Sequence, residues 1–218
     1  IMTYLQLVNS VLRRMREDEA VSIENTTDSY VKLIGEFVND ARRIVEDAWD
    51  WSALRSTITV TTTDDVFSYS MTGTNNSFKI LDVINDTSNF FMRSASSSWM
   101  NNAYLVQEPT KGSPEYYSWN GVDANGNALV DLYPKPDKAY TLRFNIVDRA
   151  DAFTLDSDKL VVPSSPVVQY AVALASRERG ETGGTSSQEL FALADTTLAD
   201  AVAFDAARFP SETVWTPC

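Results

Sequence analysis

Histidine is absent from the 218-residue sequence, and Cys218 is its only cysteine. Without histidine the chain has no Ser-His-Asp triad and no imidazole metal ligand, and a single thiol cannot form an intrachain disulfide or a cysteine-rich zinc site. Basic residues are also scarce, since 18 Lys and Arg oppose 30 Asp and Glu and give a net charge of −12. A surface that binds nucleic-acid phosphates by counterion release is therefore disfavoured.

Long apolar runs are also missing. No segment reaches the ~20 apolar residues of a membrane-spanning helix, and no basic-apolar signal peptide opens the sequence. The composition, 44% hydrophobic and 22% charged, is that of a globular protein with enough residues for one domain or two small ones. We expect a soluble protein without a membrane partner or a cofactor, which works by carboxylate or hydroxyl catalysis, or by binding and assembly.

The first part of the chain predicts two amphipathic helices. Thr3 and Gln6 have the spacing of a capping box, and apolar residues follow at helical intervals up to Met15. A second helix is predicted to begin near Asp28 and to run for about five turns. Its apolar positions are Tyr30, Leu33, Ile34, Phe37, Val38, Ala41, Ile44, Val45, Ala48 and Trp49. The two helices should form an antiparallel hairpin.

The middle of the chain predicts short β-strands. Residues 56–63 (STITVTTT) alternate, with Thr on one face and Ile58 and Val60 on the other. Turns are predicted at Thr72-Gly73, Asn120-Gly121 and Asn125-Gly126. The further strands are predicted at 66–71, 78–83, 89–93, 104–107, 116–119, 128–133 and 140–147. Such spacing is typical of an antiparallel sandwich or small barrel.

The last part of the chain predicts two more helices. Ser165 and Pro166 suggest a cap and a first helical residue before 167–179, and Gly180 supplies a left-handed stop. Ser186 and Glu189 form a second capping-box pattern. The buried stripe of the final helix is predicted to contain Leu190, Phe191, Ala194, Leu198, Ala201 and Val202, and Pro210 ends that helix.

The predicted fold class is therefore α+β. Helical hairpins from both chain ends, residues 1–55 and 164–218, form a helical bundle domain, and residues 56–163 form an inserted antiparallel β-sandwich or barrel-like domain.

Two acidic patterns invite chemical interpretations. A D-x-N-G-N segment offers the side-chain oxygens of Asp123, Asn125, Asn127 and Asp131 to a calcium ion. An EF-hand loop needs Gly and Glu at the positions that Ala128 and Pro134 occupy here. A hairpin is therefore favoured over a calcium site. The pairs 64–65 and 156/158 offer carboxylates to a glycosidase or another hydrolase. Solvated turns are the favoured interpretation of both pairs.

The aromatic residues of the β segment suggest a sugar-binding platform, which is weighed against core or subunit packing. They are Trp99, Tyr104, Tyr116, Tyr117 and Trp119. Arg177–Arg179 suits the end of a helix dipole. Arg42 and Arg43 are interpreted either as ion-pair partners of a neighbouring copy or as a solvated face.

Several short motifs together resemble a known family. They are 41–44 (ARRI), 49–51 (WDW), 133–134 (YP), 160–163 (LVVP) and 175–177 (ASR). In their order along a helix–β–helix chain they resemble the head-to-tail adaptor of short-tailed bacteriophages, also called tail tubular protein A or head completion protein.

This resemblance implies a virion structural protein without enzymatic activity. It implies a ring of identical copies, commonly twelve, between the portal protein and the tail nozzle protein at the head-tail junction, assembled in the host cytoplasm. The helical part would form the wall of the DNA ejection channel, and the β part would meet tail components. An acidic channel repels passing DNA and does not bind it specifically.

The C-terminal segment is the expected portal-docking arm. Pro210 ends the last helix, and Phe209, Val214 and Trp215 offer apolar anchors for a groove on the portal. Two other classes stay open from the residues alone: a carbohydrate-binding or receptor-reading tail-associated module, and a carboxylate-dependent hydrolase.

Overall fold

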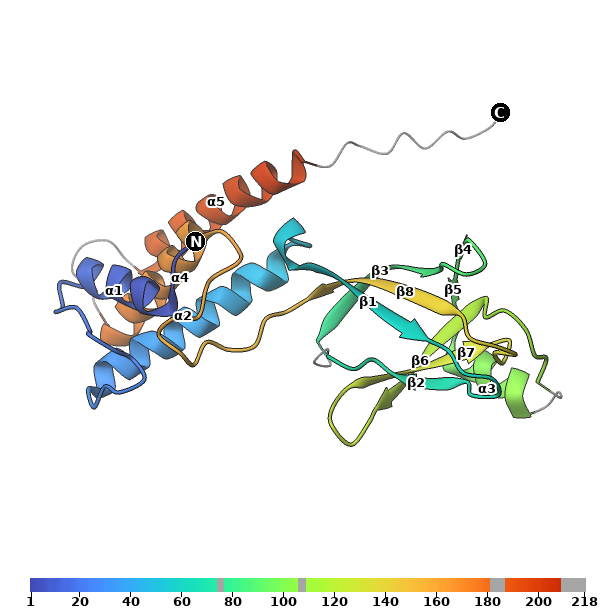
Figure 1. Ribbon diagram of the computed structural model, residues 1–218. Coiled ribbons are helices and arrows are strands. Elements are labelled where there is room, and N and C mark those ends of the chain that lie inside the picture. Colours follow the sequence, from blue (N-terminus) through green and yellow to red (C-terminus); the bar gives the residue numbers. More distant parts are fainter. Residues whose placement is uncertain (74–76, 106–108, 181–186, 209–218) are drawn as a thin grey trace, which may run out of the picture. The chain divides into compact units, whose positions relative to one another are not determined.

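The computed structural model of the chain describes residues 1–73, 77–105, 109–180 and 187–208 (Figure 1). The chain forms two compact units. A helical unit comprises Ile1–Ala53 and Asp151–Cys218, and a β unit comprises Leu54–Ala150. Helices thus come from both ends of the chain and two sheets come from its middle, which confirms the predicted α+β class.

The first two helices begin at their predicted caps. Helix α1 (Tyr4–Arg14) opens with a complete capping box, in which the backbone N–H of Gln6 donates to Oγ1 of Thr3 and the backbone N–H of Thr3 donates to Oε1 of Gln6. Helix α2 (Ser29–Ala48) is capped by Asp28, whose Oδ1 accepts the backbone N–H of Tyr30 at 2.8 Å. Both helices bury one apolar face, as their 3.6-residue period predicts.

Helix α4 (Ser164–Arg179) is the central helix of its unit and packs against α1, α2 and α5 (Figure 1). Because neighbours surround it, it is apolar on all sides and buries most of its residues. Gly180 ends it with a φ of +64°, as predicted. The predicted cap at Ser165 is wrong: the helix begins at Ser164, and Pro166 is tolerated in the first turn because its missing N–H has no partner there.

Helix α5 (Ser187–Ala206) packs along α4. Ala194 is buried, and the other five positions of the predicted stripe are half-buried. The predicted capping residue Ser186 lies outside the described residues.

Residues 151–163 belong to the helical unit, so the predicted boundary at residue 163 lies too late. The sequence pattern predicts this segment to be part of the β domain, but it buries Phe153, Leu160 and Val162 against the helical unit. It is also joined to the start of α1, because the backbone N–H of Tyr4 donates to the carbonyl oxygen of Asp158 and that of Leu160 donates to Met2. Its contacts with helices, rather than its extended backbone, decide the unit to which it belongs.

The β unit contains two four-stranded sheets. The first is antiparallel in the order β1 (Arg55–Thr61), β8 (Thr141–Asp148), β3 (Phe78–Asn85) and β4 (Phe90–Phe91). The second has the order β2 (Ser68–Ser70), β7 (Ala128–Tyr133), β6 (Tyr116–Val122) and β5 (Arg93–Ser94). Strand β5 runs parallel to β6, which makes this sheet mixed and corrects the fully antiparallel prediction.

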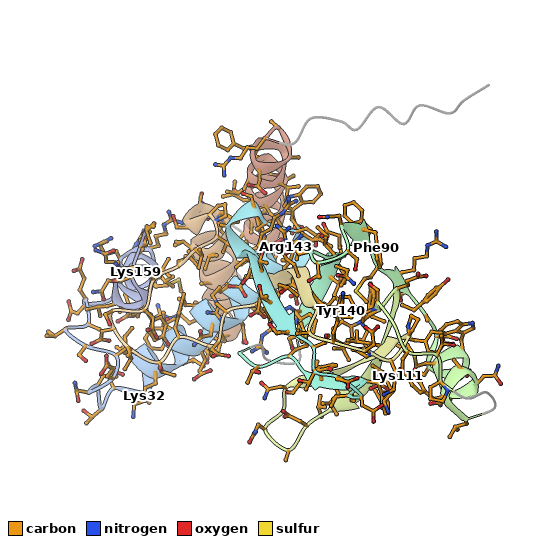
Figure 2. The ribbon with its side chains drawn as sticks, turned by 45° about the vertical axis from the view of Figure 1, so that its right-hand side comes forward. Lys32, Phe90, Lys111, Tyr140, Arg143 and Lys159 are labelled. Carbon is orange, nitrogen blue, oxygen red and sulfur yellow. The ribbon has the colours of Figure 1, made fainter. Side chains whose placement is uncertain are left out.

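The two sheets share one sandwich-like core. On β8, Leu142, Phe144 and Ile146 are buried. Arg143, which lies between them and is labelled in Figure 2, is exposed and pairs with Asp86 at 2.6 Å. This alternation follows from the two-residue period of a strand with one buried face. The core also contains Met71, Val83, Met92, Tyr117, Ala128, Val130, Leu132 and Tyr140.

Two local predictions in the β segment are wrong. Tyr104, at the start of the predicted strand 104–107, lies in helix α3 (Ser97–Leu105), where its hydroxyl donates to the carbonyl oxygen of Leu132. Packing of α3 on the second sheet outweighs local strand propensity. Asn120-Gly121 is not a turn but a bulge within β6, and Gly121 has a φ of +76°.

Candidate interaction surfaces

The negative charge is concentrated in one of the two units. Residues 1–53 and 151–218 contain 10 basic and 20 acidic side chains, a net charge of −10. Residues 54–150 contain 8 basic and 10 acidic side chains, a net charge of −2. Since the two together give −12, the helical unit carries most of the electrostatic field of the chain.

Helix α5 is the least covered helix of the helical unit. It contains four acidic residues and no basic one, and Ala194 and Asp205 are the residues that it buries. Leu193 and Phe204 are exposed, and the exposed fraction of Phe204 is 73%. A long helix with this much uncovered surface is available for contacts with other molecules.

Asp205 holds the end of α5 against the end of α2. Its Oδ1 accepts the hydroxyl of Ser52 at 2.7 Å, and its Oδ2 accepts the indole N–H of Trp49 and the backbone N–H of Ser52, both at 3.1 Å. Arg208 lies 3.5 Å from Oδ1. Burial alone would raise the pKa of Asp205, but hydrogen bonds from Ser52 and Trp49 outweigh burial and lower the pKa, so the carboxylate stays ionised.

A groove of about 310 Å³ lies beside Asp205 in the same unit. Trp51, Val162 and Phe204 line it together with residues of the chain start and of α5. Trp51 is almost fully buried and donates its indole N–H to the carbonyl oxygen of Val45 at 2.7 Å. It is thus a core anchor, whereas Trp49 is half-buried.

Arg42 is neither solvated nor directed at a neighbouring copy, so both interpretations of it are wrong. It is 2% exposed, its Nη1 donates to the carbonyl oxygen of Asp151 at 2.6 Å, and its Nε lies 3.4 Å from the carboxylate of Glu46. Its guanidinium also lies 4.4 Å from the ring centre of Phe153. Arg43 is exposed, as expected for a solvated face.

The arginines at the end of α4 do more than complement the helix dipole. Arg179 forms an ion pair with Glu17 just beyond α1, and its guanidinium lies 4.6 Å from the ring centre of Tyr30. Arg177 lies 5.4 Å from the ring centre of Phe191 on α5. These side chains connect α4 to its neighbours.

The D-x-N-G-N segment is the hairpin that joins β6 and β7. Asp123 accepts the hydroxyl of Ser70 at 2.7 Å and the backbone N–H groups of Asn125 and Asn127 at 2.8 and 2.9 Å. These bonds, from Ser70 first, lower the pKa of Asp123 to about 2. Gly126 supplies the left-handed turn residue with a φ of +85°. Within the described ranges, no group of three potential ligand side chains is placed to hold a metal ion.

Both acidic pairs bind groups of their own unit. Asp65 pairs with Lys111, which is labelled in Figure 2, at 2.8 Å and with Lys135 at 2.9 Å. Asp156 accepts the backbone N–H of Ile23, and Asp158 accepts those of Thr154 and Leu155. Burial would raise the pKa of Asp156, but hydrogen bonds from Ser22 and from the backbone outweigh burial and lower the pKa. The general acid of a glycosidase needs a raised pKa, so Asp156 does not suit that role.

The aromatic side chains of the β unit pack against one another. The ring centre of Trp99, on α3, lies 4.8 Å from that of Tyr116 and 5.3 Å from that of Tyr133. Trp119 makes edge contacts with Phe78, 5.4 Å away, and with Tyr117. Trp119 also lines a pocket of about 400 Å³ between the two sheets, together with Phe78, Ile80, Tyr117, Gly121, Val122 and Ala128.

The SU10 adaptor protein family matches residues 2–214. The chain belongs to this family. The match covers nearly the whole chain and confirms the sequence-based identification of a phage adaptor, a structural component of the virion. No curated protein matches the chain. Within the part that the structure describes, this adaptor has no helix that is long and apolar enough to cross a membrane.

The predicted docking arm of the adaptor, Phe209, Val214 and Trp215, lies outside the described residues. Asp205 and the buried pair of Arg42 and Glu46 were missed by the sequence reasoning. A signal for each was present: Asp205 continues the spacing of the α5 stripe after Ala201, and Arg42 and Glu46 are four residues apart on one helix face.

Proposed function

We propose that the chain is the head-to-tail adaptor of a short-tailed phage of the tail tubular protein A type. In this proposal identical copies, twelve as the resemblance implies, close into a ring between the portal protein and the tail nozzle protein. The genome passes through the ring during ejection. The observation that carries the proposal beyond family membership is the concentration of charge, −10 in the helical unit against −2 in the β unit.

The charge suits a channel wall for a physical reason. DNA carries a dense row of negative phosphates, and a wall that neutralised them would hold the DNA through counterion release. A wall of the same sign repels the backbone and lets it move. The helical unit is therefore proposed to face the DNA, and the nearly neutral β unit is proposed to meet the tail nozzle protein.

The C-terminal arm is proposed to dock on the portal. Phe209, Val214 and Trp215 offer apolar side chains in a segment that follows α5, and a buried Trp is a typical anchor of a protein interface. The proposal requires no catalysis and no cofactor from this chain.

Native mass spectrometry of the chain mixed with its purified portal protein tests the proposal. We expect a complex that contains a closed set of adaptor copies on each portal ring. A monomer without the portal agrees with the proposal, because binding to a partner can drive ordering and ring closure. A chain that stays monomeric in the presence of the portal contradicts it.

A second candidate function is a carbohydrate-binding, receptor-reading module of the tail. The pocket beside Trp119 favours it, because sugars stack on aromatic side chains. Binding to a glycan array that is lost in Trp119→Ala, but kept in Trp99→Ala, would support this candidate. Circular dichroism should show that both variants are folded. No glycan binding by the native chain removes the candidate.

A further inference from the structure

Asp205 is placed differently from the other acidic residues of α5. Asp205 lies in the final turn of the helix and is 6% exposed, whereas Asp200 on the same helix is exposed. A buried carboxylate is costly unless hydrogen bonds replace its water. Asp205 has three such donors, and all three come from Trp49 and Ser52.

The donors mark the point at which the chain leaves the helical unit. Trp49 is the C-cap of α2, and Ser52 begins the short 3₁₀ helix Ser52–Leu54. Leu54 is the first residue of the β unit. The carboxylate of Asp205 therefore binds both the end of α2 and the last residues before the β unit.

Along the sequence, Asp205 lies four residues before Phe209, the first residue of the proposed docking arm. Arg208, between them, donates from Nη1 to the hydroxyl of Ser52 at 3.2 Å. The other buried residue of α5, Ala194, lies about three turns earlier, so Asp205 is the one buried residue in the C-terminal half of this described helix.

We propose that Asp205 is a positioning residue that couples the docking arm to the junction at which the chain enters the β unit. The inference rests on the proposed function, since it takes 209–218 as the arm that binds the portal. A force or a change of direction at the arm acts on the end of α5 and reaches Trp49 and Ser52 through the carboxylate of Asp205, with a further hydrogen bond from Arg208 to Ser52. Portal docking thereby changes the junction that leads to the part of the chain proposed to meet the tail.

Hydrogen exchange of the free chain tests the contact itself. Asp205→Asn removes the charge and one acceptor, so exchange at residues 49–54 and 200–208 should accelerate at least about tenfold. Trp49→Phe keeps an aromatic ring but loses the indole N–H donor and part of the ring system, and it should give a smaller acceleration at the same sites. Asp200→Asn is the matched control and should leave exchange unchanged. Exchange in Asp205→Asn and Trp49→Phe equal to that of the native chain would overturn the proposal.

Hydrogen exchange with the portal protein present tests the coupling. We expect portal binding to change exchange at residues 49–54 in the native chain and in Asp200→Asn, and to lose this effect in Asp205→Asn and Trp49→Phe while the portal still binds. A loss of stability alone would not remove the response to the portal. If the variants respond as the native chain does, the coupling is wrong and the adaptor function stands. If the native chain does not bind the portal, both proposals fail.

Discussion

The guanidinium of Arg42 lies 4.4 Å from the ring centre of Phe153, within the helical unit and 111 residues away along the chain. The same side chain donates to the carbonyl oxygen of Asp151 and lies beside Glu46. One buried arginine on α2 thus holds the segment by which the chain returns from the β unit.

Loss of Arg42 should strongly destabilise the helical unit. Arg42→Met leaves Glu46 buried beside no guanidinium and removes the contact with Phe153, so we expect a loss of about 3–5 kcal/mol in the free energy of unfolding. Urea denaturation followed by circular dichroism measures it. Arg43→Met, at the exposed neighbouring position, should change stability by no more than about 0.5 kcal/mol. Equal stabilities of the two variants would contradict this role.

Trp51 should be the most sensitive aromatic position of the helical unit. Trp51→Ala empties a nearly fully buried site and leaves the carbonyl oxygen of Val45 without the indole donor, so we expect a cost of about 3–5 kcal/mol. Phe91→Ala, at a position that is 69% exposed, is the control. Thermal denaturation of the two variants should show a large decrease in Tm for the first alone.

The pKa of Asp65 offers a test of the β unit. Hydrogen bonds from Lys111 and Lys135 lower this pKa from 3.8 to about 2. Because the folded-state pKa lies below the unfolded value, the ion pairs stabilise the fold above about pH 4, and this contribution is lost as the pH falls toward 2. A carboxyl NMR titration should give the low pKa in the native chain and a higher one in Lys111→Met. Lys32→Met, in the other unit, should leave it unchanged.

The C-terminal arm should be dispensable for folding and necessary for docking. Removal of residues 211–218 leaves α5 and its contacts in place, so we expect an unchanged Tm and much weaker binding to the portal in a sedimentation assay. Val214→Ser with Trp215→Ser should reproduce the loss, and Ser211→Ala should not. Undiminished attachment of the truncated chain to the portal would rule out the arm.

Local patterns predicted most of the helices and strands. The starts of α1 and α2 depend on caps a few residues away, and the hairpin at Asn125-Gly126 depends on its own turn chemistry. The sequence did not predict helix α3, because its contacts are with strand residues that come later in the chain. Trp99 and Tyr104 pack against the ring of Tyr133, and the hydroxyl of Tyr104 donates to the carbonyl oxygen of Leu132.

The interaction surfaces were less predictable for the same reason. The burial of Arg42 depends on Asp151 and Phe153, and that of Asp205 on Trp49 and Ser52, so both require partners more than 100 residues away. The family resemblance could be recognised from the sequence because its motifs are short runs of consecutive residues. The division of charge between the two units could be counted only once the structure had given the boundaries of the units.

Electron cryomicroscopy of the native virion, compared with particles assembled without this chain, tests the central claim most directly. The account predicts a closed ring of density at the head-tail junction that is present with the chain and missing without it, with the DNA passage running through its centre. Intact junctions without the chain, or its density at any other place on the particle, would contradict the account.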